Sequence, residues 1–431
     1  MKPMNKRIAP ILIALTVMLC LLLVTACSGV GGSPAAAADA QTSQQASTGS
    51  GVSPVALSAV SESGAGDIAS EAFSERDLSG EYDADEAVVI DLDEQNGSDV
   101  VISETGTYVL TGTLTNGSVI VDAGDEDKVQ LVLSGAEINS DTYAAVYVKQ
   151  ADKVFITLAE GAENRLSNGG SFAQRDDNNV DGVIFSKSDL TLNGSGSLTI
   201  VSPAGHGVVC KDELVITGGS ISITAGAHGV QAKDSIAVSD GCLVIRSGKD
   251  GLHAENDEDD TLGAICIVGG SILIDSADDA IHAVSLLRID GGEININAAE
   301  GLEATYILIN DGNITISASD DGVNAGRKST AYTPTVEING GSLTISMGQG
   351  DTDGVDSNGN LVITGGTITI TGGSGFDFDG SVSFTGGTVT VNGQQLTQIT
   401  GQMMGGMGGM GGMGGMGGMG GFGGRGGRGR G

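Results

Sequence analysis

Residues 298–325 read AAEGLEATYILINDGNITISASDDGVNA, and one short pattern opens twice within them. EGLEA begins at Glu300 and DDGVNA begins at Asp320; in each, an acidic residue and a glycine precede an apolar, a variable and an alanine residue. Between the two copies, apolar residues alternate with polar ones, which is the period of a β-strand. The stretch therefore predicts short strands that are separated by Asp and Gly turns.

This pattern is one copy of a repeat that extends along much of the chain. Its first glycine recurs at a nearly constant step, and insertions at 256–263 and 326–334 lengthen two of the steps. One such coil cannot bury its apolar face alone, whereas stacked coils bury a continuous core. The repeat predicts an all-β fold, a parallel β-helix; a propeller needs blades of about 40 residues. The first glycine occupies positions 182, 207, 229, 251, 301, 322, 354 and 375, with Ala280 in its place in one coil.

Composition divides the chain outside the regular coils. Residues 28–85 are rich in Ala, Ser and Gly and predict a flexible tether. Residues 86–180 have alternating strands with less glycine and predict the N-terminal cap and the first, irregular coils, before the regular coils of 181–400. Residues 401–431 are mostly Gly, Met and Arg and predict a disordered tail. Cu(I) binding by the tail methionines and RNA binding by its Arg-Gly end are the alternatives.

The N-terminal segment, 1–27, predicts export. A basic start precedes an apolar run, and the ending VTAC (24–27) resembles the lipobox of bacterial lipoproteins. The resemblance implies a signal peptide over 1–27, lipid on Cys27, and anchoring to a membrane at the cell surface. An ordinary signal peptide or an uncleaved anchor is the alternative. Beyond Cys20 and Cys27, three cysteines remain, which is not a disulfide framework.

The charge balance restricts the partners. Asp and Glu number 54 against 20 Lys and Arg, which gives a formal net charge of −34. This charge repels nucleic acid and anionic lipid headgroups, and it suits a protein that binds cations. Aromatic residues make up 3% of the chain and tryptophan is absent, so the chain is poorly equipped to stack neutral sugars on aromatic faces.

Oxygen-bearing side chains recur in two columns, one directly before the first glycine (position −1) and one at the second place after it (position +2). The +2 side chains are expected to face solvent, because the apolar residues on either side of them suit the interior. Coils stack about 4.8 Å apart, so the carboxylates of one column repel each other, and no Lys or Arg occupies either column. Position −1 holds Asp250, Asp279, Glu300, Asp321 and Asp353, and position +2 holds His253, His282, Glu303, Asn324, Asp356 and Asp377.

A hard divalent cation would relieve this repulsion, and calcium takes several oxygen ligands. The alternative is that Asp before Gly serves only the turn. The two histidines are either ligands of a softer metal or plain surface residues. The candidate metal ligands are Asp250, Asp278, Asp279, Glu300, Glu303, Asp320, Asp321, Asn324, Asp353 and Asp356.

The ordered motifs KDGLHA, DDAIHA, EGLEA, DDGVNA and DGVDSNGNLVITGG resemble those of the exported, clostridial-type carbohydrate-binding domain-containing proteins. The resemblance covers residues 86 to 391. It implies a right-handed parallel β-helix similar to pectate lyases, bound calcium, and affinity for acidic plant polysaccharide, with cellulose also suggested and no lyase activity. It further implies that the calcium ligands lie among Asp250, Asp279, Glu300, Glu303, Asp321 and Asn324.

Three functions remain at this stage. The first is a lipid-anchored extracellular protein that binds polygalacturonate through calcium without catalysis. The second is a polysaccharide lyase or glycosidase of the same fold, for which Arg327 or Lys328 would be the base of a lyase. The third is a structural or adhesive surface protein.

Overall fold

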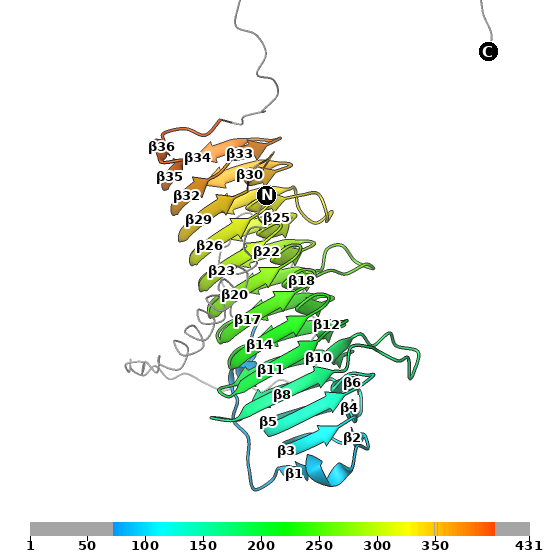
Figure 1. Ribbon diagram of the computed structural model, residues 1–431. Helices are drawn as coiled ribbons and strands as arrows, with labels where there is room; N and C mark the ends of the chain where they lie inside the picture. Colours follow the sequence, from blue (N-terminus) through cyan, green and yellow to red (C-terminus); the bar gives the residue numbers. More distant parts are fainter. Residues whose placement is uncertain (1–71, 349, 351, 401–431) are drawn as a thin grey trace, which may run out of the picture.

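The computed structural model describes residues 72–348, 350 and 352–400. Within these residues the chain winds into a stack of β-strand coils, which rises from β1 at one end to β36 at the other (Figure 1). The predicted all-β parallel solenoid is thereby confirmed. The predicted signal peptide, the lipidation site Cys27, most of the tether and the tail lie outside the described residues.

Each regular coil contributes three strands. In the coil of the opening stretch these are β24 (Leu302–Ala304), β25 (Tyr306–Ile309) and β26 (Asn313–Ala318). The first strand of each coil joins a 12-stranded parallel sheet, and the other two join a 24-stranded sheet. The 12-stranded sheet also contains β2 (Val100–Ile102), β4 (Val119–Asp122), β6 (Val146–Gln150), β9 (Gly182–Ser186), β12 (His206–Cys210), β15 (Val230–Ala232), β18 (Leu252–Ala254), β21 (Ile281–Ala283), β27 (Val323–Ala325), β30 (Asp353–Ser357) and β33 (Ser374–Phe378).

The 24-stranded sheet forms the remaining faces of the coils. Its strands pair in parallel, apart from the antiparallel pair β35–β36. Besides β25 and β26 it contains β1 (Val88–Asp91), β3 (Gly106–Thr115), β5 (Lys128–Ser140), β7 (Lys153–Leu158), β8 (Glu163–Asn168), β10 (Asp189–Gly194), β11 (Ser197–Ser202), β13 (Glu213–Ile216), β14 (Ser220–Ala225), β16 (Ser235–Val238), β17 (Cys242–Ser247), β19 (Ala264–Ile267), β20 (Ser271–Ser276), β22 (Leu286–Ile289), β23 (Glu293–Ala298), β28 (Thr335–Ile338), β29 (Ser342–Met347), β31 (Asn360–Ile363), β32 (Thr367–Thr371), β34 (Val382–Phe384), β35 (Thr388–Val391) and β36 (Gln394–Leu396).

Close packing between coils explains the glycine that marks the repeat. A Cβ atom on Gly301 would lie 2.3 Å from the carbonyl oxygen of Gly322 and 2.6 Å from the Cγ2 atom of Ile316. A Cβ on Gly322 would likewise meet the carbonyl oxygen of Gly354 at 2.7 Å. The first glycine is thus required because the backbone of the next coil and a core isoleucine occupy the space that a side chain would need.

The N-terminal segment differs from the prediction of a tether that continues to residue 85. Helix α3 (Glu75–Leu78) begins with a reciprocal cap between Ser74 and Asp77. The side chain of Asp77 is buried and pairs with Lys153 on β7, with 2.9 Å between Nζ and Oδ1. Within the described residues the segment from 72 onward therefore packs on the solenoid, because a buried ion pair and a helix cap hold it there.

The first coil is closed by the short 3-10 helix η2 (Leu92–Gln95). Leu92 is buried in the solenoid core at this end. At the other end, β36 turns back antiparallel on β35 and covers part of the last coil. Both devices cover open edges that would otherwise pair with other chains. Among the described residues no helix is long and apolar enough to cross a bilayer.

Candidate metal centre

The two predicted columns lie next to each other on the 12-stranded sheet. The side chains at position +2 belong to direct partners in the parallel ladder, so that each lies beside its counterpart in the next coil. This register follows from the constant distance between the first glycine and the +2 position in each coil. The ladder runs from His253 through His282, Glu303, Asn324 and Asp356 to Asp377.

Burial of the columns corrects the expectation that the +2 side chains face solvent. His253 and Glu303 are 6% and 8% exposed, and the −1 side chains of Asp250 and Asp279 belong to residues that are 3% and 8% exposed. They point away from the core, but the adjacent column and the neighbouring coils cover them. Glu300, Asp321, Asn324, Asp353 and Asp356 are half-buried, whereas Asp278 and Asp320 are exposed.

The −1 side chains also serve the backbone. The amide N–H of Asp279 donates to Oδ1 of Asp250, at 3.2 Å, and the N–H of Asp353 donates to Oδ1 of Asp321, at 2.7 Å. Each −1 side chain in these pairs therefore accepts the N–H of the −1 residue in the following coil. The turn role that was the alternative to metal binding is present, and it uses one oxygen of each carboxylate.

Counter-charges enter the columns from two sources. His282 Nδ1 lies 2.9 Å from Asp279 Oδ2 and 2.9 Å from Glu303 Oε2. Lys328 comes from the 326–334 insertion, and its Nζ lies 2.7 Å from Glu303 Oε1. The repeat pattern does not predict Lys328 beside the columns, because an insertion residue has no fixed position in the repeat. Arg327, the other base candidate, is exposed.

Two insertions, residues 256–263 and 326–334, lie beside the +2 column and are called the wall below. Thr330 donates from its backbone N–H and its hydroxyl to the carboxylate of Asp260, at 2.8 and 3.0 Å, so the loops after β18 and β27 meet across the intervening coils. Glu255 follows β18 and places its Oε2 3.1 Å from His253 Nε2. On this side of the column, the carboxylate of Glu255 contacts His253, and the ammonium of Lys328 contacts Glu303.

The pKa values of the column reflect crowded, buried acids. Burial raises the pKa of Glu300 to about 7, and the charges of Glu303, Asp279 and Asp320 add to the rise while a hydrogen bond from Asn324 opposes it. Burial also raises the pKa of Asp321 and of Asp356 to about 6, with neighbouring acids adding to both shifts. Burial thus disfavours the charged forms of these acids, and a cation beside them would favour those forms.

The pKa of His282 moves the opposite way. Burial alone would lower it, but hydrogen bonds to Asp279 and Glu303 raise the pKa to about 10. The pKa of Glu303 in turn is held below its usual range: burial opposes ionisation, but contacts with His282 and Lys328 outweigh it. The charge of each of these groups thus affects the pKa of its neighbours in the column.

One oxygen-only group fits calcium by its chemistry. Asp279, Glu300 and Glu303 each offer a carboxylate oxygen, and these atoms lie within 4.8 Å of one another. Asp279 and Glu303 are buried and Glu300 is half-buried. Carboxylate oxygens are the ligands that calcium takes, in flexible numbers and geometry. These three residues would hold the ion, while the other candidate ligands lie along the same column or, like Asp278 and Asp320, at the surface.

The sequence analysis missed the upstream part of the column. His206 and His228 occupy position −1 before Gly207 and Gly229, in HGVVC and HGVQA. With His253 and His282 they form a continuous stack, in which adjacent ring centroids lie 5.1, 4.3 and 4.8 Å apart. These are all four histidines of the chain. Extending the −1 position to earlier coils would have found them.

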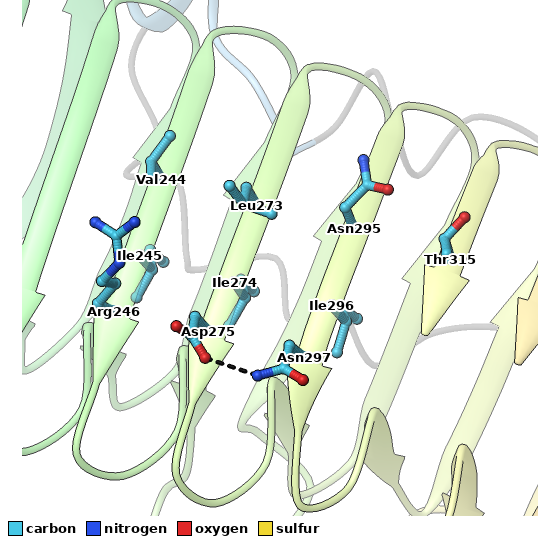
Figure 2. Close-up of a pocket in the computed structure, with 10 residues that line it drawn as sticks. All are labelled: Val244, Ile245, Arg246, Leu273, Ile274, Asp275, Asn295, Ile296, Asn297 and Thr315. Atoms are coloured by element: carbon cyan, nitrogen blue, oxygen red, sulfur yellow. Dashed lines mark hydrogen bonds between the residues drawn. The ribbon is translucent and has the colours of Figure 1, made fainter. Parts of the chain in front are cut away.

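A shallow groove of about 390 Å³ lies on the outer surface of the 24-stranded sheet, across β17, β20, β23 and β26 (Figure 2). Arg246, Asp275 and Asn297 line one side of it, and Asn297 Nδ2 donates to Asp275 Oδ1 at 2.8 Å. Val244 and Leu273 lie farther along the same strands. The lining residues include no aromatic ring, so the groove offers hydrogen bonds and aliphatic contact rather than a stacking platform.

A family model described as carbohydrate-binding domain-containing protein matches residues 96–354. A protein of that description from Acetivibrio thermocellus is 36% identical over 129 residues, which are 30% of this chain and 45% of that relative. A solved polysaccharide lyase-like protein from C. thermocellum, a gadolinium derivative, is similar with a TM-score of 0.48 and 31% identity, over 53% of this chain and 96% of its own.

Proposed function

Because the chain belongs to the carbohydrate-binding domain-containing protein family, we propose that it is a non-catalytic, calcium-dependent binder of acidic polysaccharide, with polygalacturonate as the preferred class of ligand. The proposal includes export and anchoring through lipid on Cys27, so that the solenoid stands outside the cell. Membership of the family supports carbohydrate as the ligand. The calcium and the acidic sugar are argued from the column and the charge.

The observation that carries the proposal is the buried oxygen cluster of Asp279, Glu300 and Glu303. Two carboxylates about 4 Å apart repel by roughly 4 kcal/mol at an effective dielectric of 20. His282 and Lys328 neutralise part of this charge, but burial and the neighbouring acids still raise the pKa of Glu300. A calcium ion held by these three residues would supply the missing positive charge and present an open face to another carboxylate.

Net charge favours a polyuronate over cellulose as the ligand that needs calcium. A chain with a formal charge of −34 repels a polyanion, and an ion shared between protein and sugar carboxylates reverses the sign of the contact. Neutral cellulose would instead call for aromatic stacking. The groove of Figure 2 has no aromatic lining, so its polar groups serve better as a secondary contact for sugar hydroxyls.

Lyase activity is the second candidate, because Lys328 reaches the acidic column. Its ammonium is engaged with Glu303 rather than directed to a free space beside it. Arg327 is exposed on the same insertion. We therefore assign no catalytic residue.

Retention on immobilised polygalacturonate tests the proposal with the full chain, in calcium and in EDTA. We expect retention in calcium only, together with no unsaturated product by ultraviolet absorbance. The variant Glu300→Gln/Glu303→Gln should lose retention, because it removes two of the three carboxylates. The matched control Glu163→Gln/Glu293→Gln removes two exposed acids from the long strands and should be retained like the wild type.

Four results would count against it. Equal retention in EDTA would show that calcium is not required. Loss of retention in the control variant would show that the effect of Glu300→Gln/Glu303→Gln comes from net charge rather than from the cluster. Formation of unsaturated product would make the protein a lyase. Loss of that product in Lys328→Met or in Arg327→Met would then identify the base. Absence of retention on any acidic glycan would leave the structural role.

A further inference from the structure

The column changes its chemistry along its length. Toward the C-terminal coils three carboxylates converge, those of Asp279, Glu300 and Glu303, and His282 pairs with two of them. Toward the N-terminal coils, two imidazoles and one carboxylate converge instead, in His228, Asp250 and His253. Their candidate ligand atoms lie within 4.8 Å of one another, and all three residues are buried.

We propose that His228, Asp250 and His253 form a separate site for a late first-row divalent metal ion, with Zn²⁺ as its representative. Imidazole nitrogen suits zinc, copper and nickel, whereas calcium takes oxygen ligands. Two histidines and one carboxylate also leave coordination positions for water or a further ligand. This site does not depend on the proposed calcium and polysaccharide function.

One pair of donor atoms has the spacing expected around a tetrahedral ion. Ligands about 2.0–2.1 Å from zinc lie about 3.3 Å from one another in tetrahedral geometry. His228 Nδ1 and Asp250 Oδ2 are 3.3 Å apart. His253 Nδ1 lies 2.6 Å from the same Oδ2 atom, which is a hydrogen-bond distance, so it must move outward by less than an ångström to become a ligand.

A hydrogen bond within the cluster would have to give way to a metal ion. His228 Nδ1 accepts the backbone N–H of Asp250 at 3.2 Å, and a metal ion at this nitrogen would replace that hydrogen bond, because the nitrogen has one lone pair. Asp250 Oδ2 lies 3.3 Å from the same nitrogen. A metal ion between the two atoms would form two coordinate bonds in place of one hydrogen bond.

Glu255 lies where a cation could enter the cluster from solvent. Its side chain is 46% exposed at the wall, and its Oε2 lies 3.1 Å from His253 Nε2. A surface carboxylate at the mouth of a buried cluster attracts a cation and orients the histidine that will bind it. The neighbouring His206 has a different setting, since its nearest carboxylate, on Asp181, is 3.9 Å away.

Calorimetric titration of the full chain with Zn²⁺ tests this site after EDTA treatment and dialysis into millimolar Ca²⁺, so that calcium already occupies any oxygen-only site. Zinc is preferred over copper as the probe, because the methionines of residues 401–431 are soft ligands that favour Cu(I). We expect one zinc ion per chain at the cluster. His228→Gln/His253→Gln should weaken zinc binding at least about tenfold, since loss of even an outer-shell partner costs 10–100-fold.

The control variants separate the two ends of the column. His206→Gln removes a stacked imidazole outside the cluster and should leave zinc affinity unchanged. Glu300→Gln should weaken calcium binding and spare zinc. Zinc binding that survives in the double histidine variant, or that millimolar calcium abolishes in the wild type, would overturn the proposal.

A second measurement covers the case in which the double variant fails to fold. Co²⁺ bound to the wild-type chain should give the intense visible absorption bands of a tetrahedral site, and Zn²⁺ should displace them. Absence of these bands at saturating Co²⁺ would overturn the site without recourse to any variant.

Discussion

At the residue scale, the acids before the glycines have two roles that the sequence presents as alternatives. In Asp250 and Asp321, one carboxylate oxygen accepts the backbone N–H of the next coil. The other oxygen of Asp250 lies close to two histidines, His228 and His253. A repeat can therefore keep an acid at this position for its turn and still build a cation site from the second oxygen.

Lys328 competes for the site that the proposed function assigns to calcium. Its Nζ lies 2.7 Å from Glu303 Oε1, and a unit charge about 4 Å from another costs or gains about 1 kcal/mol in water. We expect Lys328→Met to bind calcium about fivefold more tightly in a calorimetric titration. Arg327→Met, which removes an exposed charge from the same insertion, is the control. Weaker calcium binding by Lys328→Met would show that the lysine supports the site instead.

A second group of acids makes stability depend on pH away from the column. Burial raises the pKa of Glu213 to about 7; the charges of Asp189, Asp212 and Asp234 add to the rise, and Lys153 opposes it. The folded state thus keeps a proton that the unfolded state loses near pH 4.5, so stability falls as the pH rises from about 4.5 through 7.

Glu213→Gln should remove this loss. Measured by urea unfolding in EDTA, the variant should gain about 1 kcal/mol over the wild type at pH 8, after allowance for solvent screening at a half-buried side chain. Near pH 4 the difference contributed by ionisation should vanish. Glu163→Gln, at an exposed position, is the control. A gain of the same size at both pH values would point to packing rather than to ionisation.

At the element scale, the sequence predicts the strands and their register well and their surroundings less well. The regular step of the repeat places Glu303 beside Asn324 in the ladder, as β24 and β27 confirm. The same reasoning could not foresee that Asp250, Asp279 and Glu303 are buried, because a repeat pattern does not show what packs around a side chain. It also missed the docking of α3, whose Asp77 pairs with a lysine far along the chain.

The first glycine of each coil allows a test at the element scale. A methyl group on Gly301 would lie 2.3 Å from a backbone oxygen of the next coil, which cannot move without shifting β27. We expect Gly301→Ala to lower the free energy of unfolding by about 1–3 kcal/mol, as overpacking does. Gly326→Ala is the matched control, because its Cβ would meet no atom closer than 3.8 Å. Equal stability of the two variants would mean that the coils separate more readily than their packing implies.

At the scale of the whole molecule, repetition determines what a single chain reveals. Many similar coils determine the fold, so a wrong strand assignment in one coil does not change the predicted architecture. The candidate site is set by exceptions to the repeat. Lys328 lies in an insertion, and the histidines change from position −1 at His228 to position +2 at His253. Contacts among such exceptions depend on side-chain directions, which a repeat pattern does not contain.

Net charge and metal binding predict different effects on stability, and the whole chain can distinguish them. A ligand that binds only the folded state stabilises it by about 2.7 kcal/mol at a concentration of 100 times its Kd. We therefore expect millimolar calcium to raise the Tm by several degrees and EDTA to reverse the rise. Screening of a formal charge of −34 also raises the Tm, but it depends on ionic strength rather than on the ion.

The comparison is made at matched ionic strength. NaCl should then produce a smaller rise than CaCl₂, and Glu300→Gln/Glu303→Gln should respond equally to the two salts, because it keeps most of the surface charge and lacks two of the three column carboxylates. If NaCl reproduces the calcium rise in the wild type, the acids of the column act only through the overall field, and the proposed ion between the coils is wrong. Because the stacked acids lie between successive coils, an ion bound there stabilises the contact between coils and is linked to the cooperative unfolding of the whole stack.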